Sequence, residues 1–460
     1  MMKKKILAAI LASVMVLSIA GCNQEQSGGN NSTNDTTEGT QAPSNEGGNG
    51  EAAENPLTIL AWESNSDIKN MVKIFCEETG TDPSMIVVSP QGSNGEGGRD
   101  QYQQYLKGDG DADLMCLEAD WILQYINDDS LTAPLSDIGI DESKLANPYS
   151  YTVAIGKNEA GVLKGASFQA APGGFCYRAD LAEQYLGVTS PDEMQALIGD
   201  WDKFQAAAKT LYEASEGKTS MAATEGGLWQ VFQANRTQPW VKDGKLVMDT
   251  ATEFYTIATS FKENNYLAGV PQWDPAWYAA IQDGTALGDF VPTWGMTNAE
   301  GSILYNFTNE GKNEGTMAFC EGPSNYFWGG TWLGVSTKCN NKELAQQFVE
   351  FFTCDPDGMK AYSLGTGDFC NNKSVMKEIV DEKSNSNALL KDGQDQFGIF
   401  LGAADGINLD GLITKYDSVI KGHFNDSVNG LLDGTYEDAA AAEVGFKQKV
   451  KASFPEIEVE

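Results

Sequence analysis

Arginine and histidine are scarce in this chain of 460 residues, which excludes several kinds of site. Arginine occurs only at Arg99, Arg178 and Arg236, so a bidentate clamp for phosphate or carboxylate has few possible donors. Histidine occurs only at His423, which excludes a histidine-rich metal site and makes a Ser-His-Asp or Cys-His mechanism depend on one residue. The sequence therefore predicts no catalytic residue, no metal site and no cofactor.

Closely spaced cysteine pairs are also missing. Beyond Cys22 the number of cysteines is odd and no two of them form a Cys-x-x-Cys pair, so neither a zinc site nor a complete set of disulfides is indicated. Several lie inside apolar runs, as Cys116 does in Leu-Met-Cys-Leu, and most are expected to be buried as small hydrophobic residues. These cysteines are Cys76, Cys116, Cys176, Cys320, Cys339, Cys354 and Cys370.

Positive charge is in short supply as a whole. The chain has 31 Lys and Arg residues against 65 Asp and Glu residues, and its formal net charge is -34. General binding to nucleic acid or to an anionic lipid surface is excluded, because both need a surface rich in Lys and Arg. A cationic ligand is allowed but not required, since acidity by itself also keeps a protein soluble.

The amino-terminal residues have the pattern of an export signal. Three lysines at positions 3–5 precede an apolar run over 6–19 that is too short to span a bilayer. The run ends in Ile-Ala-Gly-Cys, which resembles the lipobox of bacterial lipoproteins, whose cysteine is diacylated and becomes the mature amino terminus. We expect 1–21 to be a signal peptide and Cys22 to anchor the protein at the extracellular face of a Gram-positive cell membrane. An ordinary secreted protein with a chance cysteine is the alternative.

The segment that follows, residues 22–55, is predicted to be a flexible linker. After Cys22 it has no aromatic residue and no Val, Leu, Ile or Met, so it cannot bury enough apolar surface to offset the entropy of ordering. Such a coil has a root-mean-square reach of roughly 30 Å. It would hold a globular body away from the membrane.

The remaining body, residues 56–460, is too long for one small core and indicates two lobes. Short apolar runs at 57–62, 85–89 and 113–117 are predicted to be strands. Amphipathic helices are predicted after Ser66, after Ser190 and over 341–353. Strands that alternate with helices are typical of an α/β fold.

One pattern imitates a calcium-binding loop. Asp109, Asp111, Asp113 and Asp120 occupy positions one, three, five and twelve of an EF-hand loop. Position six, where that loop needs glycine, is Leu114, and an apolar strand begins there. The acidic run is therefore interpreted as a turn that leads into a strand.

Four segments together resemble a known family. Residues 108–138 combine a Gly/Asp turn, a buried strand, an acidic residue near an aromatic one and a Pro-Leu loop, and they resemble the bacterial family 1 extracellular solute-binding proteins. Residues 166–181 resemble that family's first crossover between lobes, and 190–211 resemble its Trp-Asp-x-Phe helix. Residues 321–372 resemble its Gly-Gly strand, Ala-x-x-Phe helix and return crossover.

The resemblance implies a two-lobed, periplasmic-binding-protein-like fold of type II, which closes on its ligand about hinge crossovers. Lobe 1 is expected to contain 56–170 and 318–366, and lobe 2 to contain 171–317 and 367–460. The glycines of 172–174 and 365–367 lie where the crossovers are expected. They are candidates for hinges, because glycine accepts large dihedral changes, or alternatively for rigid turns.

The loops after the predicted strands indicate a carbohydrate ligand. A sugar ring offers an apolar face and a rim of hydroxyls, so its site needs flat aromatic side chains beside carboxylate and amide groups. Asp120 is expected to accept a hydroxyl without having a structural partner, and Trp294 to be the main stacking platform. Each tryptophan in these loops could equally well be a core residue as a ligand-binding one, because tryptophan is highly buried on average. The predicted ligand-binding residues are Trp62, Glu63, Glu118, Asp120, Trp121, Trp294, Asn298, Asn325 and Trp328.

The function implied by the resemblance is capture of an oligosaccharide and its delivery to the permease of an ABC importer, by a monomer that is not an enzyme. Two other classes stay open. A binding protein for a polyamine would place the same tryptophans and carboxylates around ammonium groups. A surface glycosidase needs two carboxylates at a defined separation, and 65 acidic residues always allow such a pair to be imagined.

Overall fold

The computed structural model describes residues 55–62, 66–93, 95–108 and 110–459. The predicted signal peptide, Cys22 and residues 23–54 of the predicted linker lie outside these ranges, and so do Glu63 and Asp109. Within the described ranges, no helix combines the length and the apolar character needed to cross a membrane. No cluster of His, Cys, Asp or Glu suited to a metal ion occurs among the described residues either.

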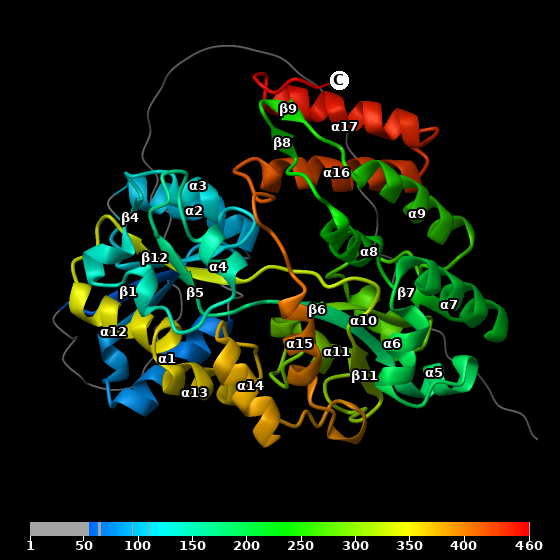
Figure 1. The fold of residues 1–460 in the computed structure, drawn as a ribbon, viewed down its shortest axis with the longest axis horizontal. Coiled ribbons are helices and arrows are strands. Elements are labelled where there is room, and N and C mark those ends of the chain that lie inside the picture. Colours follow the sequence, from blue (N-terminus) through cyan, green and yellow to red (C-terminus); the bar gives the residue numbers. More distant parts are fainter. Residues whose placement is uncertain (1–54, 63–65, 94, 109, 460) are drawn as a thin grey trace, which may run out of the picture. The chain divides into compact units, whose positions relative to one another are not determined.

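The fold is α/β and has two lobes, each built on its own sheet (Figure 1). In the first sheet β1 is parallel to β2 and β3, and β12 is antiparallel to β3, β4 and β5. The predicted strands at 57–62, 85–89 and 113–117 correspond to β1, β2 and β3. The strands of this sheet are β1 Leu57–Ala61, β2 Ile86–Pro90, β3 Leu114–Glu118, β4 Thr132–Ala133, β5 Gly165–Ser167 and β12 Thr331–Ser336.

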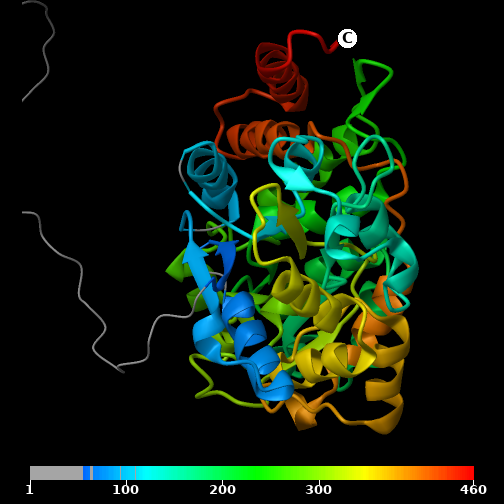
Figure 2. The same cartoon turned by 90° about the vertical axis from the view of Figure 1, so that its left-hand side faces the viewer.

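Helices α1, α12 and α13 pack together against the first sheet, as the blue and yellow helices of Figure 2 show. The predicted apolar face of α1 is buried, and its Phe75 ring lies 5.2 Å from the Phe348 ring of α12. Gly80 ends α1 with a φ of 75°, the left-handed conformation that glycine adopts without steric cost. The helices of this lobe are α1 Ser66–Thr79, α2 Gly95–Lys107, α3 Ile122–Ile126, α4 Ser150–Ile155, α12 Lys342–Thr353 and α13 Pro356–Thr366, with α14 Lys373–Glu382 beside α13.

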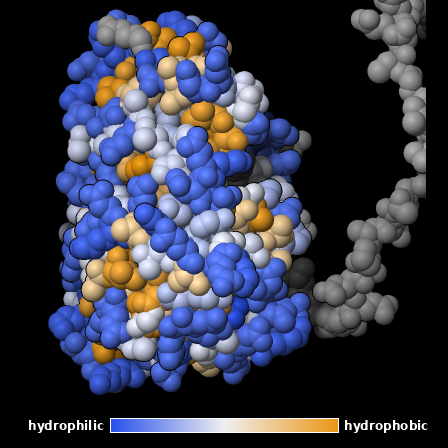
Figure 3. All heavy atoms as spheres, turned by 90° about the vertical axis from the view of Figure 1, so that its right-hand side faces the viewer, coloured by the Kyte–Doolittle hydropathy of each residue, from blue (hydrophilic) through white to orange (hydrophobic). Residues whose placement is uncertain are grey.

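The second sheet has the order β11-β6-β10-β7, in which only β10 and β7 are parallel. A separate hairpin of β8 and β9 projects from this lobe (Figure 1). The outer side of the lobe is mainly hydrophilic, with scattered apolar side chains (Figure 3). The strands are β6 Gly173–Arg178, β7 Ser220–Ala222, β10 Ala286–Pro292, β11 Met317–Cys320, β8 Val241–Lys242 and β9 Lys245–Leu246.

The second lobe carries most of the remaining helices. Ser190 caps α6 as its capping-box spacing predicts, because its hydroxyl accepts from the Glu193 N–H at 3.3 Å. Helices α16 and α17 pack on α9 beside an aromatic cluster around Trp229 and Phe424, whose rings are 4.4 Å apart. The helices are α5 Ala179–Leu186, α6 Pro191–Ile198, α7 Trp201–Ala214, α8 Glu225–Phe232, α9 Ala251–Glu263, α10 Pro275–Gln282, α11 Ile303–Phe307, α15 Gln396–Asp405, α16 Asp417–Leu432 and α17 Ala439–Ser453. Short 3-10 helices occupy Pro83–Met85, Leu135–Ile138, Glu142–Lys144, Gln233–Asn235, Thr293–Gly295 and Lys391–Gly393.

Three chain segments connect the sheets or run beside the connection, over 168–172, 321–330 and 367–372. The predicted boundary at 318 needs correction, because β11 pairs with β6 and so lies with the second sheet. A Cβ on Gly173 would come within 2.2 Å of the Tyr326 ring, so close packing requires this glycine. Gly367 has a φ of 78° and ends α13, which favours the rigid-turn alternative at that position.

The acidic run before β3 has a structural role. Asp113 is buried, and its carboxylate accepts from the backbone N–H of Thr58 at 2.8 Å. It also accepts from the N–H groups of Asn340 and Asn341, at 2.8 and 2.9 Å. The carboxylate therefore ties β1 to the start of α12, in agreement with the interpretation of this run as a turn and not as a calcium loop.

Candidate functional site

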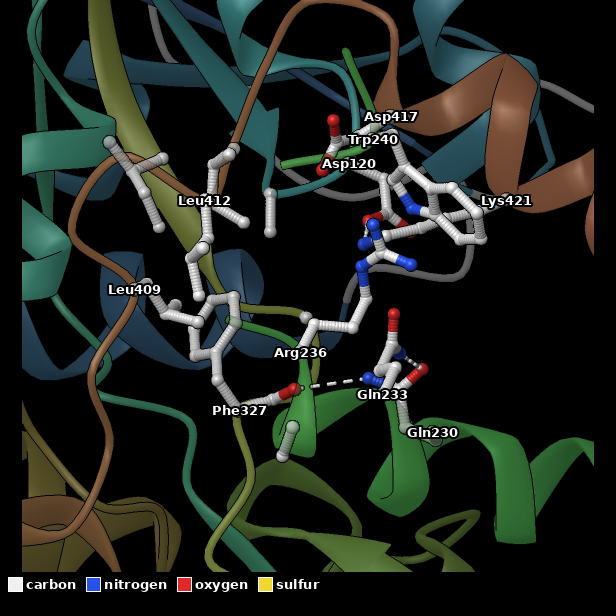
Figure 4. A pocket seen from close by; sticks show the side chains of 15 residues that line it. Asp120, Gln230, Gln233, Arg236, Trp240, Phe327, Leu409, Leu412, Asp417 and Lys421 are labelled. Carbon is white, nitrogen blue, oxygen red and sulfur yellow. Dashed lines mark hydrogen bonds and ion pairs between the residues drawn. The ribbon is translucent and has the colours of Figure 1, made fainter. Parts of the chain in front are cut away.

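A pocket between the lobes is lined by side chains from both of them (Figure 4). Asp120, which follows β3, comes from the first lobe, and Gln230 of α8 and Lys421 of α16 come from the second. Gln230 is held by the carbonyl of Phe327 in a crossover, to which its Nε2 donates at 3.0 Å. The pocket thus lies where the ends of strands and the crossovers meet, as ligand sites of α/β folds do.

Asp120 forms a polar contact between the lobes. Its Oδ1 accepts from Nζ of Lys421 at 2.8 Å. The expectation that Asp120 has no structural partner is therefore wrong. Lys421 is a half-buried cation: partial burial opposes its charge, but the carboxylates of Asp120 and Asp417 raise its pKa. Burial also raises the pKa of Asp417 to about 6.

Two further contacts join the same stretch of chain to the first lobe. Nζ of Lys415 lies 3.1 Å from a carboxylate oxygen of Glu159. A guanidinium nitrogen of Arg99, in α2, donates to the hydroxyl of Ser418 at 3.3 Å. Together with Lys421, these residues make 415–421 a connection between the lobes, which we call the interlobe contact.

Arg236 lines the pocket but is not available as an anion clamp. Its guanidinium stacks on Trp240 with 3.8 Å between its central carbon and the ring centroid. The nitrogens donate to the backbone carbonyls of Gln238, Val247 and Met248 at 2.9–3.1 Å. Burial lowers the pKa of Arg236 to about 10. Its role is therefore to hold the chain that leads into α9.

Three indoles gather beside the pocket. Trp273 and Trp294 are stacked with 6.0 Å between ring centroids and 19° between planes. Trp328 lies edge-on to both, and its carbonyl accepts from the Trp294 Nε1 at 3.1 Å. Trp294 follows β10 directly, and Gly329, which lines the pocket, would place a Cβ 3.2 Å from the Trp294 Nε1. We call these three residues the indole cluster.

Trp273 is unusual within this cluster. It is 51% exposed although it is a large apolar residue, and its φ is 70°. A bulky residue in the left-handed region is strained, and such strain gathers at functional sites. The sequence analysis did not select Trp273, because backbone strain has no signature in the sequence.

Two polar residues beside the indole cluster were not predicted. Oε1 of Glu225, the first residue of α8, is buried and has no hydrogen-bond partner among the described residues. Nε2 of Gln272, the residue before Trp273, is also buried and has no hydrogen-bond partner among the described residues. Burial alone raises the pKa of Glu225 to about 7. Glu225 follows β7 closely, so the rule that selected residues after strands applies to it, but β7 has only three residues and gives a weak sequence signal.

A buried carboxyl holds this wall of the site together. Asp289 of β10 is fully buried and accepts from the Trp277 Nε1 at 2.7 Å and from the Thr224 hydroxyl at 2.9 Å. Thr224 in turn caps α8, since its hydroxyl accepts from the Gly227 N–H at 3.0 Å. Burial raises the pKa of Asp289 to about 7. Asp289 thus connects the start of α8, where Glu225 lies, to α10, which begins shortly after Gln272.

The structure brings some of the predicted residues together and separates others. Trp294 and Trp328 are in contact. Trp121 is only 1% exposed, and it packs between Tyr102 and Tyr125 while its indole N–H donates to the Gly95 carbonyl, so it offers no face to a ligand.

The other predicted residues lie apart from the indole cluster. Trp62 is half-buried against the apolar residues of the first lobe. The Glu118 carboxylate accepts from the Asp120 N–H at 2.8 Å. Asn298 is exposed, and Asn325 faces Gly406 in a neighbouring groove. Glu63 lies outside the described residues.

Comparison with known proteins gives the family. The model of the bacterial extracellular solute-binding proteins matches residues 70–391. No curated protein matches the chain. A solved extracellular solute-binding protein of family 1 is 18% identical, with a TM-score of 0.72 over 87% of this chain and 100% of that one.

Two further solved structures share the fold. The GacH receptor of Streptomyces glaucescens, studied unliganded and with acarbose, is 13% identical, with a TM-score of 0.66 over 88% of this chain and 99% of that one. An ABC transporter associated binding protein from B. animalis subsp. lactis, in complex with β-1,6-galactobiose, is 17% identical, with a TM-score of 0.63 over 86% and 98%. At these identities the likeness shows the fold, while the family match over most of the chain shows the family. The chain belongs to the bacterial extracellular solute-binding proteins.

Proposed function

We propose that this protein captures an oligosaccharide between its lobes and delivers it to the permease of an ABC importer. The observation that carries the proposal is the indole cluster, which supplies stacking faces next to the carboxylate and amide groups of Glu225 and Gln272. Sugar rings are recognised by this combination of apolar faces and polar atoms. The sugars in the titles of the related structures support the same ligand class.

Calorimetric titration with a panel of oligosaccharides and polyamines tests the proposal. Residues 52–460 form one compact unit and suit the measurement. Sugar binding in the micromolar range or tighter is expected. Binding of polyamines without binding of any sugar would favour the polyamine alternative and contradict the proposal.

The family match and the lack of a recognised nucleophile motif in the sequence support transport rather than catalysis. The sugar is expected to leave the protein unchanged. Incubation of a bound oligosaccharide with the pure protein, followed by chromatography, would show shorter products if the glycosidase alternative were correct.

Ligand binding is proposed to close the lobes about the crossovers. At a ligand concentration about 100 times the dissociation constant, binding stabilises the closed form by about 2.7 kcal/mol. Small-angle scattering should then report a smaller radius of gyration with sugar than without it. Equal dimensions in the presence of a sugar of proven affinity would contradict hinge closure.

Attachment to the extracellular face of the membrane through Cys22 completes the proposal. The support is the Ile-Ala-Gly-Cys pattern at 19–22 and the extracellular family. In a bacterial host, labelled fatty acid should be incorporated into the natural protein and not into Cys22→Ser. Equal labelling of the two proteins would contradict the anchor.

A further inference from the structure

We propose that Asp67 and Asp368 control the closure of the lobes through a shared proton: the two carboxyls share it when the lobes are closed, and its loss favours the open form. We call these two residues the carboxyl pair. The inference rests on the proposed closure of the lobes and adds its regulation by pH. Neither residue lines the pocket between the lobes, so the pair acts on ligand binding through the arrangement of the lobes.

The carboxyl pair lies where two of the connecting segments run side by side. The segments over 168–172 and 367–372 are joined by backbone hydrogen bonds, such as the one from the Asn371 N–H to the Phe168 carbonyl at 2.9 Å. Asp368 belongs to the second of these segments and is fully buried. A rotation of one lobe against the other must be absorbed by such connecting segments. The pair is therefore placed where it can sense that rotation.

Both lobes and a crossover surround the carboxyl pair. Asp67 lies in the first turn of α1, in the first lobe. Nε2 of Gln169, in the crossover, donates to Oδ2 of Asp67 at 3.4 Å and to Oδ2 of Asp368 at 2.5 Å. Burial raises the pKa of Asp368, while the hydroxyls of Tyr362 in α13 and of Thr293, which follows β10 in the second lobe, oppose this rise. Movement of the lobes therefore changes the surroundings of the pair.

The charge of the carboxyl pair is not balanced by a cation. No Lys, Arg or His among the described residues forms an ion pair with Asp67 or Asp368. The titratable groups that face the pair are Tyr362, Cys116 of β3 and Cys370, and burial raises the pKa of each, so all three are neutral near pH 7. Two neighbouring carboxylates repel each other, and such a pair titrates as a unit that retains one proton. Burial and the charge of Asp368 raise the pKa of Asp67 to about 7.

The direction of the pH effect follows from burial. Opening of the lobes admits water, which favours the charged form and returns the pKa towards the ordinary value of about 4. The closed form therefore binds the proton more tightly than the open form does. This preference for the closed form is fully present below about pH 4, and it is lost as the pH rises through about 7, the pKa of Asp67 in the structure.

Ligand affinity should follow the same trend, because only the closed form encloses the ligand. Between about pH 5 and 7 the affinity should fall by up to about tenfold for each pH unit. The protein would therefore capture its ligand more tightly in mildly acidic surroundings than in alkaline ones.

Other groups titrate in the same pH range, so a substitution must assign the proton. Burial raises the pKa of Glu225 and of Asp289 to about 7 and that of Asp417 to about 6. Asp67→Asn keeps the shape of the side chain and removes the proton. Asp357→Asn is the matched control, because Asp357 also lies in the first turn of a helix of the first lobe but is exposed.

Calorimetry in buffers of different ionisation enthalpy measures the protons taken up on binding. Maltose, acarbose and β-1,6-galactobiose are the probes. Near pH 6 the natural protein and the control should each take up about one proton more than Asp67→Asn does. The affinity of Asp67→Asn should depend less on pH than theirs. Circular dichroism and thermal unfolding establish that each variant is folded.

The outcomes separate the inference from the proposed function. Equal proton uptake in Asp67→Asn and in the natural protein would overturn the inference and leave sugar binding intact. If Asp67→Asn does not fold, the natural protein decides, since an affinity that is independent of pH overturns the inference and a fall with rising pH supports it.

Small-angle scattering without a ligand decides the case in which none of the three sugars binds. A radius of gyration that grows with pH in the natural protein but not in Asp67→Asn would support the inference although the proposed function failed. A radius that is independent of pH would overturn it.

Discussion

Asp289, which is fully buried, and Glu225, whose Oε1 is buried, belong to the same lobe, and burial raises the pKa of each carboxyl to about 7. Asp289 accepts hydrogen bonds from Trp277, Thr224 and Phe290, whereas Oε1 of Glu225 accepts none from the part of the chain that the structure describes. A raised pKa alone therefore does not separate a hydrogen-bonded structural carboxyl from one that has no such donors. The hydrogen-bond donors around the group distinguish the two, because most buried polar atoms in folded proteins have a hydrogen-bond partner.

The largest effect is expected from Asp289→Ala. The substitution leaves the Trp277 N–H and the Thr224 hydroxyl without their acceptor in a fully buried place, so the free energy of unfolding should fall by about 3 to 4 kcal/mol. Denaturant unfolding measures the loss. Asp289→Asn keeps one acceptor oxygen and should lose less. A loss below about 1 kcal/mol would show that the hydrogen bonds of Asp289 do not make it a structural carboxyl.

Trp294→Ala should instead weaken sugar binding, by about 2 kcal/mol, because it removes one face of the indole cluster. The loss should be larger for long oligosaccharides than for monosaccharides if several rings are held. Trp201→Ala is the matched control, since Trp201 is also half-buried in the second lobe but donates to Ser324 away from the cluster. It should lower stability and leave sugar affinity unchanged. Equal affinity losses in the two variants would mean that the cluster is ordinary core.

A pair of buried carboxyls in another part of the molecule predicts how the free energy of unfolding depends on pH. Asp67 and Asp368 are bridged by Nε2 of Gln169, at 3.4 and 2.5 Å, and Tyr362 also donates to Asp368. Burial and the charge of Asp368 raise the pKa of Asp67 to about 7, and burial raises that of Asp368. The contribution of Asp67 to the free energy of unfolding is fully present below about pH 4, where the carboxyl is protonated in both the folded and the unfolded protein. It is lost as the pH rises through about 7, the pKa of Asp67 in the folded protein.

Asp67→Asn should therefore flatten the fall of stability between pH 5 and 7. The variant releases one proton fewer when it unfolds, so the slope of the free energy of unfolding against pH should become less steep by about 1.4 kcal/mol per pH unit. Asp82→Asn is the control with the opposite sign, since hydrogen bonds from Ser84 lower the pKa of Asp82 and its effect belongs to acidic pH. An unchanged slope in Asp67→Asn would show that this pair is not protonated in the native state.

The smallest stability effect is expected at the interlobe contact. Asp120→Ala removes the partner of Lys421, but Asp417 remains nearby, so the loss should be about 1 kcal/mol. The single variant Lys421→Met removes the half-buried cation itself and should cost less stability than Asp120→Ala. Thermal unfolding of the two variants makes the comparison. If Lys421→Met proves the more damaging, the lysine has a role beyond its ion pair.

The sequence predicted the strands at 57–62, 85–89 and 113–117 from their short apolar runs. Strands β1 and β3 are buried inside the first sheet, whereas β2 lies at its edge and is partly exposed. Through the order of family-like segments it selected both Trp294 and Trp328 as ligand-binding residues, and in the structure their two rings are in contact. It could not separate Trp121 from them, since an aromatic residue after a strand has the same local pattern whether it turns into the core or out of it. The pairing of Asp120 with Lys421, 301 residues apart, has no local signal at all.

The interlobe contact also bears on the order in which the molecule assembles. Lys415, Ser418 and Lys421 meet partners that lie 256, 319 and 301 residues earlier in the chain. Closing loops of this length costs entropy before any contact is made, and lobes of this size fold as units. We therefore expect the interlobe contact to form after the two lobes have folded. A protein truncated before α16 would contain the strands of both sheets yet lack the ion pairs and the hydrogen bond of this contact.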